Sequence, residues 1–300
     1  MKALFVHAHF DDYEFTAAGT FALWQRQLRD DFQGRVLVCT DGKAGHHRLS
    51  REETGRVRLA EQEESARIGG YEFQHLRLPD GTIPRETSLR HTPTLLAALW
   101  RAIREFEPDY LFCPPLPVDP LAGVHLDHSD VAQAIRDVAY LINVPHAYTP
   151  EYPDESAEAR SCRVPVILTV FDSYLAGANA FDLAVDIEPV FEQVARMSWC
   201  HQSQIREWLP WVGRHQMNAP ESPAEWSSEL RTRFERENVR LGLPRRPLTE
   251  VFTVTAWGES PSVDRLLADF PGLIPNPERE ARLRLRFPET SGDEPVQGGI

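Results

Sequence analysis

Short apolar runs alternate with longer amphipathic segments along most of this chain. Runs typical of buried strands occupy residues 2–8, 35–40, 73–78, 109–113 and 164–170. Segments with the length and spacing of helices occupy residues 15–29, 51–68, 93–106, 128–142 and 189–208. This alternation is typical of βαβ units. We therefore predict an α/β fold in which helices flank a mostly parallel sheet.

The alternating pattern weakens beyond about residue 212, where one more helix (226–242) and one more strand (250–257) are predicted. The last stretch, 288–300, is polar and contains Pro and Gly. We expect a main domain over residues 1–210 and a C-terminal elaboration over 211–287 packed on the same domain. Residues 288–300 are expected to form a flexible tail.

Two histidines and three carboxylates fall within residues 7–14, His-Ala-His-Phe-Asp-Asp-Tyr-Glu, just after the first predicted strand. In a parallel sheet the ligand site lies beyond the carboxyl ends of the strands. His9 and Asp12 suit a metal ion, and Asp11 then stands where a general base would act. His7 lies within the strand and is expected to pack rather than ligate. The simpler alternative is that Asp11 or Asp12 only caps the following helix.

A second cluster, Gly-Val-His-Leu-Asp-His at 123–128, follows the strand at 109–113 and a Pro-rich loop. His125 and His128 are three residues apart, so both can face one site. One of them would complete a set of two histidines and one carboxylate, with a position left open for water. The other would stabilise an oxyanion or protonate a leaving amine. Alternatively, the segment is a helix-start loop with two exposed histidines.

Both clusters resemble the motifs of a known family. A-H-F-D-D-Y-E at 8–14 looks like the A-H-P-D-D-x-E motif of the PIG-L / LmbE-like deacetylases, and G-V-H-L-D-H looks like the second motif of that family. Weaker similarities follow in the family's order, and together they span about residues 3–205. They are T-D-G-K-A-G at 40–45, R-L-A-E at 58–61, I-G at 68–69, L-P-D-G at 78–81, V-D-I at 185–187 and H-Q-S-Q at 201–204.

The resemblance implies a Rossmann-like catalytic domain and a zinc-dependent mechanism, although ferrous iron also accepts two histidines and one carboxylate. The implied zinc ligands are His9, Asp12 and His128. The implied catalytic residues are Asp11, as general base, and His125, which would stabilise the tetrahedral oxyanion. Arg58 and Asp80 would bind substrate near the mouth of the site.

The function expected from these residues is a hydrolase that removes an acetyl group from an N-acetylglucosamine-type or related N-acylated small molecule. One alternative is a metal-dependent hydrolase of a non-sugar amide or ester. Another is an inactive sugar-binding or regulatory protein, although both clusters keep every residue that the chemistry needs. No G-x-G-x-x-G follows the first strand and no H-E-x-x-H is present, which disfavours a dinucleotide-binding protein and a zincin protease.

Charge and composition narrow the choice of partners. The chain has 32 Lys and Arg against 45 Asp and Glu, a formal charge of -13, which argues against nucleic acid and anionic membranes. No apolar stretch approaches the ~20 residues that span a bilayer. Lys2 leads into the first strand without a cleavage site, so we expect no secretory signal and a cytoplasmic location. The four cysteines include no C-x-x-C pair and are expected to be reduced. The sequence leaves open whether the protein forms a homo-oligomer.

Three further features carry weaker expectations. Phe10 stands where the family has proline, which is expected to make the ligand-bearing turn less rigid. His46 and His47 are expected to belong to a solvated loop, with the rim of the site as the alternative. The tryptophans at 199, 208 and 211 are expected to serve a core or an interface rather than a sugar platform.

Overall fold

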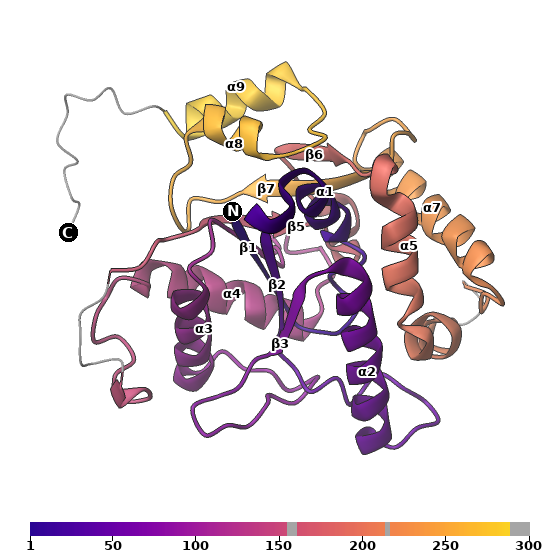
Figure 1. Ribbon diagram of the computed structural model, residues 1–300, viewed down its shortest axis with the longest axis horizontal. Helices are drawn as coiled ribbons and strands as arrows, with labels where there is room; N and C mark the ends of the chain where they lie inside the picture. Colours follow the sequence, from indigo (N-terminus) through magenta and orange to yellow (C-terminus); the bar gives the residue numbers. More distant parts are fainter. Residues whose placement is uncertain (155–160, 214–216, 289–300) are drawn as a thin grey trace.

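A computed structural model describes residues 1–154, 161–213 and 217–288, so the predicted tail lies outside the described residues except for Pro288. Seven strands form one sheet in the order β3-β2-β1-β4-β5-β7-β6. The strands are β1 (Lys2–His7), β2 (Gln33–Val38), β3 (Glu72–His75), β4 (Tyr110–Cys113), β5 (Val166–Val170), β6 (Leu183–Asp186) and β7 (Thr249–Val254). The longer helices are α1 (Ala18–Leu28), α2 (Arg51–Gly69), α3 (Pro93–Phe106), α4 (Leu126–Leu141), α5 (Phe191–Trp199) and α7 (Pro223–Arg240) (Figure 1).

Strands β1 to β5 are parallel, and β7 runs antiparallel to both β5 and β6. The predicted mostly parallel sheet flanked by helices is therefore confirmed. Among the described residues, no helix has both the length and the apolar character that a membrane crossing requires.

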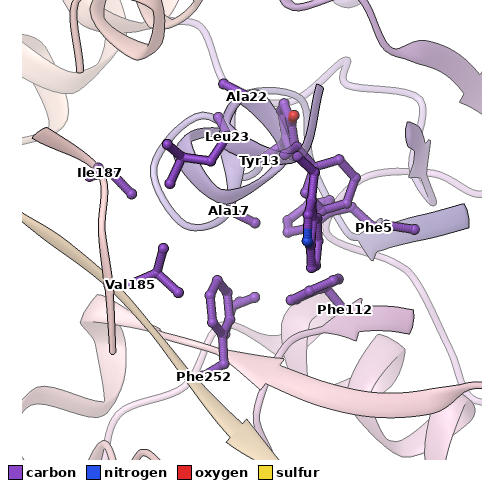
Figure 2. Packing of buried hydrophobic residues seen from close by; sticks show 14 of the residues in the cluster. Phe5, Tyr13, Ala17, Ala22, Leu23, Phe112, Val185, Ile187 and Phe252 are labelled. Atoms are coloured by element: carbon purple, nitrogen blue, oxygen red, sulfur yellow. The ribbon is translucent and has the colours of Figure 1, made fainter. Parts of the chain in front are cut away.

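The strand residues alternate between two apolar cores. Ala3 and Phe5 of β1 face the core that also contains residues of α1, α5 and α7, whereas Leu4 and Val6 face the core shared with α3 and α4. Figure 2 shows the first of these cores, where Phe5 packs against Tyr13 and Phe112 packs against Phe252. Because a strand points successive side chains to opposite faces, continuous apolar runs are needed where helices cover both faces.

The helix boundaries follow local signals in the sequence. Ser50 and Glu53 form a capping box at the start of α2, and Gly70 ends that helix with a φ of 69°. Proline at the first position of α3 follows the Thr92 cap. These signals explain why α2 and α3 begin and end close to the predicted residues.

The predicted helix over 189–208 is interrupted. Helix α5 ends at Trp199, and a separate π-helical segment, Ser203–Trp208, follows before the short helix α6 (Leu209–Val212). The sequence prediction also missed β6 and the helices α8 (Val263–Asp269) and α9 (Pro277–Arg286). These elements are short, so they carry few repeats of any periodic pattern.

The C-terminal part of the chain enters the sheet. Strand β7 lies between β5 and β6 (Figure 1). Glu250, near its start, contacts the beginning of helix α1. The Glu250 carboxylate accepts hydrogen bonds from the backbone N–H groups of Gly19 and Thr20, both at 2.7 Å. These N–H groups belong to the first turn of α1, where no intrahelical acceptor is present. A distant carboxylate thus caps the helix that follows the first polar cluster.

Candidate metal centre

The two polar clusters meet where the order of the strands reverses. Strand β1 lies between β2 and β4, so the loops that leave β1 and β4 diverge from neighbouring positions at the same edge of the sheet. The first loop carries His9 to Asp12, and the second leads to His125, immediately before α4. A pocket of about 190 Å³ opens there, and both clusters line it. The structure therefore brings together two segments that are more than 100 residues apart in the chain.

Three candidate ligand atoms converge in this pocket. His9 Nδ1 lies 3.2 Å from His128 Nε2 and 3.4 Å from Asp12 Oδ2, and His128 Nε2 lies 3.6 Å from Asp12 Oδ1. Ligands about 2.0–2.1 Å from a tetrahedral zinc ion stand about 3.3–3.4 Å from each other. The spacing of these donors therefore fits a tetrahedral divalent cation.

The other ring nitrogen of each histidine contacts a buried carboxylate. His9 Nε2 lies 3.1 Å from Asp127 Oδ2, and His128 Nδ1 lies 2.8 Å from Asp172 Oδ2. When these nitrogens carry the protons, each histidine donates to its carboxylate and turns a lone pair toward the pocket. In that protonation state two lone pairs face each other beside the Asp12 carboxylate, and a divalent cation would bind all three ligand atoms.

Neither Asp127 nor Asp172 was among the predicted site residues. Asp127 lies inside the quoted G-V-H-L-D-H segment, and Asp172 comes two residues after the end of β5. The rule that sites lie beyond the carboxyl ends of parallel strands points to Asp172 as well. The backbone N–H of Thr87 donates to Asp127 at 2.7 Å, which fixes that carboxylate from a third segment of the chain.

His7 and Asp12 form a close pair next to the convergent atoms. His7 is buried and stacks on Phe5, and its Nδ1 lies 2.5 Å from Asp12 Oδ2. Burial acts to raise the pKa of Asp12, but His7 and His128 hold it well below its usual range. Asp12 therefore stays ionised, as a metal ligand must. Donor atoms of His7, Asp12 and His128 also lie within 4.8 Å of one another, so His7 packs at the very edge of the site.

Asp11 lies in the same pocket in an unusual backbone conformation. Its φ of 79° is in the left-handed region, which is uncommon for a residue other than glycine and is often found at functional sites. The Asp11 N–H donates to Gln62 Oε1 at 3.3 Å, which helps to hold this conformation. Burial raises the pKa of the Asp11 carboxyl to about 6, while Arg58 acts in the opposite direction. This carboxylate can accept a proton near neutral pH.

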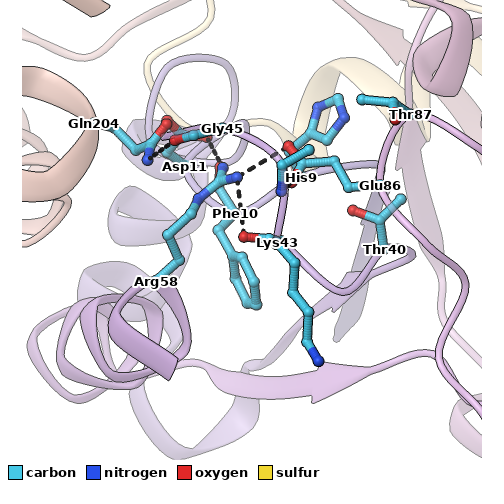
Figure 3. A network of polar contacts seen from close by, with 12 residues as sticks. His9, Phe10, Asp11, Thr40, Lys43, Gly45, Arg58, Glu86, Thr87 and Gln204 are labelled. Atoms are coloured by element: carbon cyan, nitrogen blue, oxygen red, sulfur yellow. Dashed lines mark hydrogen bonds and ion pairs between the residues drawn. The ribbon is translucent and has the colours of Figure 1, made fainter. Parts of the chain in front are cut away.

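Arg58 is buried and lines the pocket between two carboxylates. Its guanidinium lies 3.0 Å from Glu86 and 3.5 Å from Asp11, and it donates to the carbonyl of Phe10 at 3.1 Å (Figure 3). Glu86 was not predicted from the sequence. Asp80 does not join this group, because it is exposed in the turn after β3, where its carboxylate accepts from Thr82. The structure thus brings Arg58, but not Asp80, to the other candidate residues.

His125 is the cap of α4 and lines the pocket. Its Nδ1 accepts a hydrogen bond from the Asp127 backbone N–H at 3.2 Å, so in the neutral ring the proton is on Nε2. Partial burial, together with His9 and His128, lowers the pKa of His125. Its ring centroid lies 4.6 Å from that of His9. A neutral histidine in this position can donate a hydrogen bond to an oxygen that gains negative charge.

A buried network supports the loop from behind. The Glu14 carboxylate accepts from Ser65 at 2.5 Å, from Tyr71 at 3.0 Å and from Gln62 at 3.1 Å. His201 of the H-Q-S-Q segment is fully buried, and its Nε2 lies 3.2 Å from Glu14 Oε1. Since Gln62 also accepts from Asp11, this network connects helix α2 and the segment after α5 to the candidate base.

The expectation about Phe10 is corrected by its packing. The ring is fully buried, with centroids 5.9 Å from Phe73 and 5.0 Å from His75. Gly42 lies so close that an added Cβ would approach Phe10 to 2.1 Å. The ring thus fills a tight space against β3. Packing fixes the turn here in the way that the pyrrolidine ring of proline would.

Several solved structures have a similar fold, and three of them have TM-scores between 0.56 and 0.61. N,N'-diacetylchitobiose deacetylase from Pyrococcus horikoshii is 22% identical, with 85% of this chain and 84% of that chain covered and a TM-score of 0.61. The conserved protein TT1542 from Thermus thermophilus is 21% identical, with 84% of this chain and 93% of that chain covered and a TM-score of 0.58. The 4-carboxy-2-hydroxymuconate hydratase GalB from Pseudomonas putida is 17% identical, with 85% of this chain and 95% of that chain covered and a TM-score of 0.56. At these identities the likeness establishes a shared fold. No curated protein matches this chain.

The family comparison concerns the region that contains both clusters. Residues 4–139 match the model of the PIG-L family, described as GlcNAc-PI de-N-acetylase. This range includes His9, Asp11, Asp12, His125 and His128. The chain therefore carries a PIG-L family region in residues 4–139, which confirms the family predicted from its motifs.

Proposed function

We propose that this protein is a zinc-dependent N-deacetylase that acts on an N-acetylglucosamine-type small molecule. The observation that carries the proposal is the facing pair of nitrogens, His9 Nδ1 and His128 Nε2, 3.2 Å apart beside Asp12 in a pocket that Asp11 and His125 also line. The PIG-L match supports the reaction class. Fold likeness alone does not decide it, because GalB, with a similar fold, is a hydratase.

In this proposal His9, Asp12 and His128 hold the metal ion, which when bound supplies Lewis-acid activation of water and of the substrate carbonyl. Ferrous iron would suit the same donors. Asp127 and Asp172 orient the two histidines. Because these carboxylates accept the ring protons, both histidines keep their lone pairs directed into the pocket.

Asp11 acts as general base in the proposed reaction. It takes a proton from the attacking water as the new C–O bond forms at the acyl carbon. His125 donates its Nε2 proton in a hydrogen bond to the carbonyl oxygen while that oxygen gains charge. The proton on Asp11 then passes to the amide nitrogen as the C–N bond breaks, which releases acetate and the free amine. The guanidinium of Arg58, 3.5 Å from Asp11, helps to hold the Asp11 carboxylate in position.

The test is the release of acetate from a panel of N-acetylglucosaminides by the purified protein with added zinc, with and without a chelator. The Asp11→Asn variant is the control for contaminating activity. Release that requires metal and Asp11 supports the proposal. If the protein binds zinc but releases no acetate from any member of the panel, the deacetylase proposal is wrong, and non-sugar amides and esters become the next substrates to test.

A further inference from the structure

Four aromatic rings stack in a row that begins at the pocket of the candidate metal centre. Trp208 and Trp211 have ring centroids 5.3 Å apart, Trp211 and His47 are 4.8 Å apart and nearly parallel, and His47 and His46 are 5.3 Å apart. We call these four residues the aromatic stack. One end, Trp208, lines the pocket, and Trp211 is 55% exposed. The stack therefore connects the pocket, through the half-exposed Trp211, to the loop that carries His47 and His46.

The His46 end of the stack is held by polar contacts. His46 Nδ1 accepts from the backbone N–H groups of Arg48 and Leu49, and its Nε2 lies 3.3 Å from Glu207. The His46 side chain is buried, so the predicted solvated loop is wrong at this residue. His46 thus joins the loop before α2 to the π-helical segment that carries Trp208.

A second link between the same two segments lies beside Trp208. Gln204 Nε2 donates to the Gly45 carbonyl at 3.0 Å (Figure 3). A Cβ on Gly45 would lie 3.5 Å from Trp208 Nε1 and 3.2 Å from Arg58, so glycine permits this close approach. The segment that carries Trp208 is therefore tied to the loop at Gly45, and the ring of Trp211 packs against the Trp208 indole. A π-helical turn is rare and often occurs at functional sites.

The size of the pocket indicates what the stack can bind. At about 190 Å³ the pocket is smaller than the ~300–1,000 Å³ of sites that enclose a drug-sized ligand. A substrate with a second ring beyond the acylated residue must therefore extend past the rim. Trp211 covers one face of Trp208, and Trp208 lines the pocket. A pre-fixed indole loses little conformational freedom when a flat ring packs against it.

We propose that Trp208, held by the aromatic stack, forms a subsite for a six-membered ring attached to the acylated sugar. This inference rests on the proposed function and narrows its substrate class to glycosides whose aglycone presents a flat apolar ring face. Two sources share that chemistry, the C–H face of a second pyranose and an aromatic ring. The reaction itself stays with the metal ligands, Asp11 and His125, so Trp208 determines specificity rather than catalysis.

Binding is tested by calorimetry on the full-length protein, zinc-loaded and metal-free, with three amine products that differ only in the aglycone. They are methyl glucosaminide, the glucosaminyl-glucosamine disaccharide and phenyl glucosaminide. We expect the disaccharide, the phenyl glycoside or both to bind at least about tenfold more tightly than the methyl glycoside, which equals about 1.4 kcal/mol. Whichever compound shows the gain identifies the ring that the subsite takes.

The variants are Trp208→Ala, Trp208→Phe and the matched control Trp199→Ala. Trp199 lies on α5 and lines a separate groove. Trp208→Ala should remove the preference for ring-bearing products and Trp208→Phe should keep most of it, while the Trp199 variant should behave as wild type. Thermal unfolding of each variant checks that it folds. The proposal is overturned if wild type shows no preference or if Trp208→Ala keeps it.

Kinetics distinguishes this proposal from the proposed function. With N-acetylated substrates, Trp208→Ala should raise KM for the ring-bearing glycosides about tenfold and leave kcat near the wild-type value. If no acetate is released from any substrate but the binding preference is present and needs Trp208, the deacetylase proposal fails and the ring subsite stands. If acetate is released with equal KM values for all aglycones, the subsite is wrong and the reaction stands.

Discussion

His9 Nδ1 and His128 Nε2 face each other at 3.2 Å. The other ring nitrogen of His9 contacts the Asp127 carboxylate, and that of His128 contacts the Asp172 carboxylate. Both pairs are buried. The carboxylates draw the ring protons to the outer nitrogens, so the inner nitrogens present two lone pairs to the same point. In that protonation state a divalent cation would bind both lone pairs, and this is the geometric basis for the proposed metal site.

Removing either outer carboxylate should weaken metal binding. Asp127→Asn and Asp172→Asn each replace an acceptor with an amide that can also donate, so the histidine tautomer is no longer fixed. We expect zinc affinity to fall about 10–100-fold for each variant. Competition with a chromophoric chelator measures the Kd. Asp130→Asn, on the same helix as Asp127, is the matched control, and an equal loss there would contradict the role assigned to the two carboxylates.

Asp11→Asn should separate metal binding from turnover. The amide keeps the shape of the side chain but cannot accept the proton, so kcat should fall by about 10²–10⁴. Zinc affinity should stay within about threefold of wild type, because the three metal ligands remain. Activity and Kd are measured on the same preparation. A variant with a near-native rate would show that Asp11 is not the base.

Arg58→Gln should move the pH dependence of the rate. The base must be ionised, so the rate should rise as pH increases through the pKa of Asp11, which lies at about 6. Arg58 lowers that pKa through its positive charge, so its loss should shift the rising limb of kcat/KM to higher pH. Profiles of wild type and variant from pH 5 to 9 provide the measurement. If the rising part of the kcat/KM profile stays at the same pH in the variant, a group other than Asp11 controls it.

The buried pair of His201 and Glu14 should make stability depend on pH. Burial opposes the positive charge on His201, yet Glu14 raises the pKa of His201 above 6.5. Burial likewise opposes the negative charge on Glu14, but His201 and Ser65 hold the pKa of Glu14 below 4.5. The histidine contributes most below pH 6.5 and loses its contribution as pH rises through its raised folded pKa. The carboxylate contributes above pH 4.5 and loses its contribution as pH falls.

His201→Gln tests this expectation. The free energy of unfolding should fall by roughly 3–5 kcal/mol near pH 5.5, where both charges are present. The difference from wild type should shrink above pH 6.5, because the wild type itself loses the ion pair as the pH rises. Urea unfolding at pH 5.5, 7 and 8.5 gives these free energies. A difference that is the same at all three values would show that His201 acts by packing alone.

Much of the sheet is predictable from the sequence because β1, β2, β4 and β5 are covered on both faces. Such strands are continuous apolar runs that end at polar clusters, and their order along the chain implies parallel pairing. Strand β6 has only four residues and pairs with β7, far away in the sequence. Its place in the sheet depends on contacts that no local pattern records.

The same contrast holds within the candidate site. His9, Asp12 and His128 lie in short segments whose spacing already indicates a metal site. Glu86 approaches Arg58 from a different loop, and Asp172 approaches His128 from the end of β5. The position of Asp172 beyond the end of β5 places it at the correct edge of the sheet, but which residue each of these carboxylates contacts becomes visible only when the segments are brought together in space.

The bond from Glu250 to the start of α1 has a consequence for how this chain is made. During synthesis the N-terminal segments leave the ribosome first, and domains generally fold as units while the chain grows. Here the first-turn N–H groups of Gly19 and Thr20 bind a carboxylate that lies more than 200 residues later in the chain. The cap of the helix beside the first polar cluster is thus in place only after residue 250 has been translated, so a product that ends before β7 would lack it.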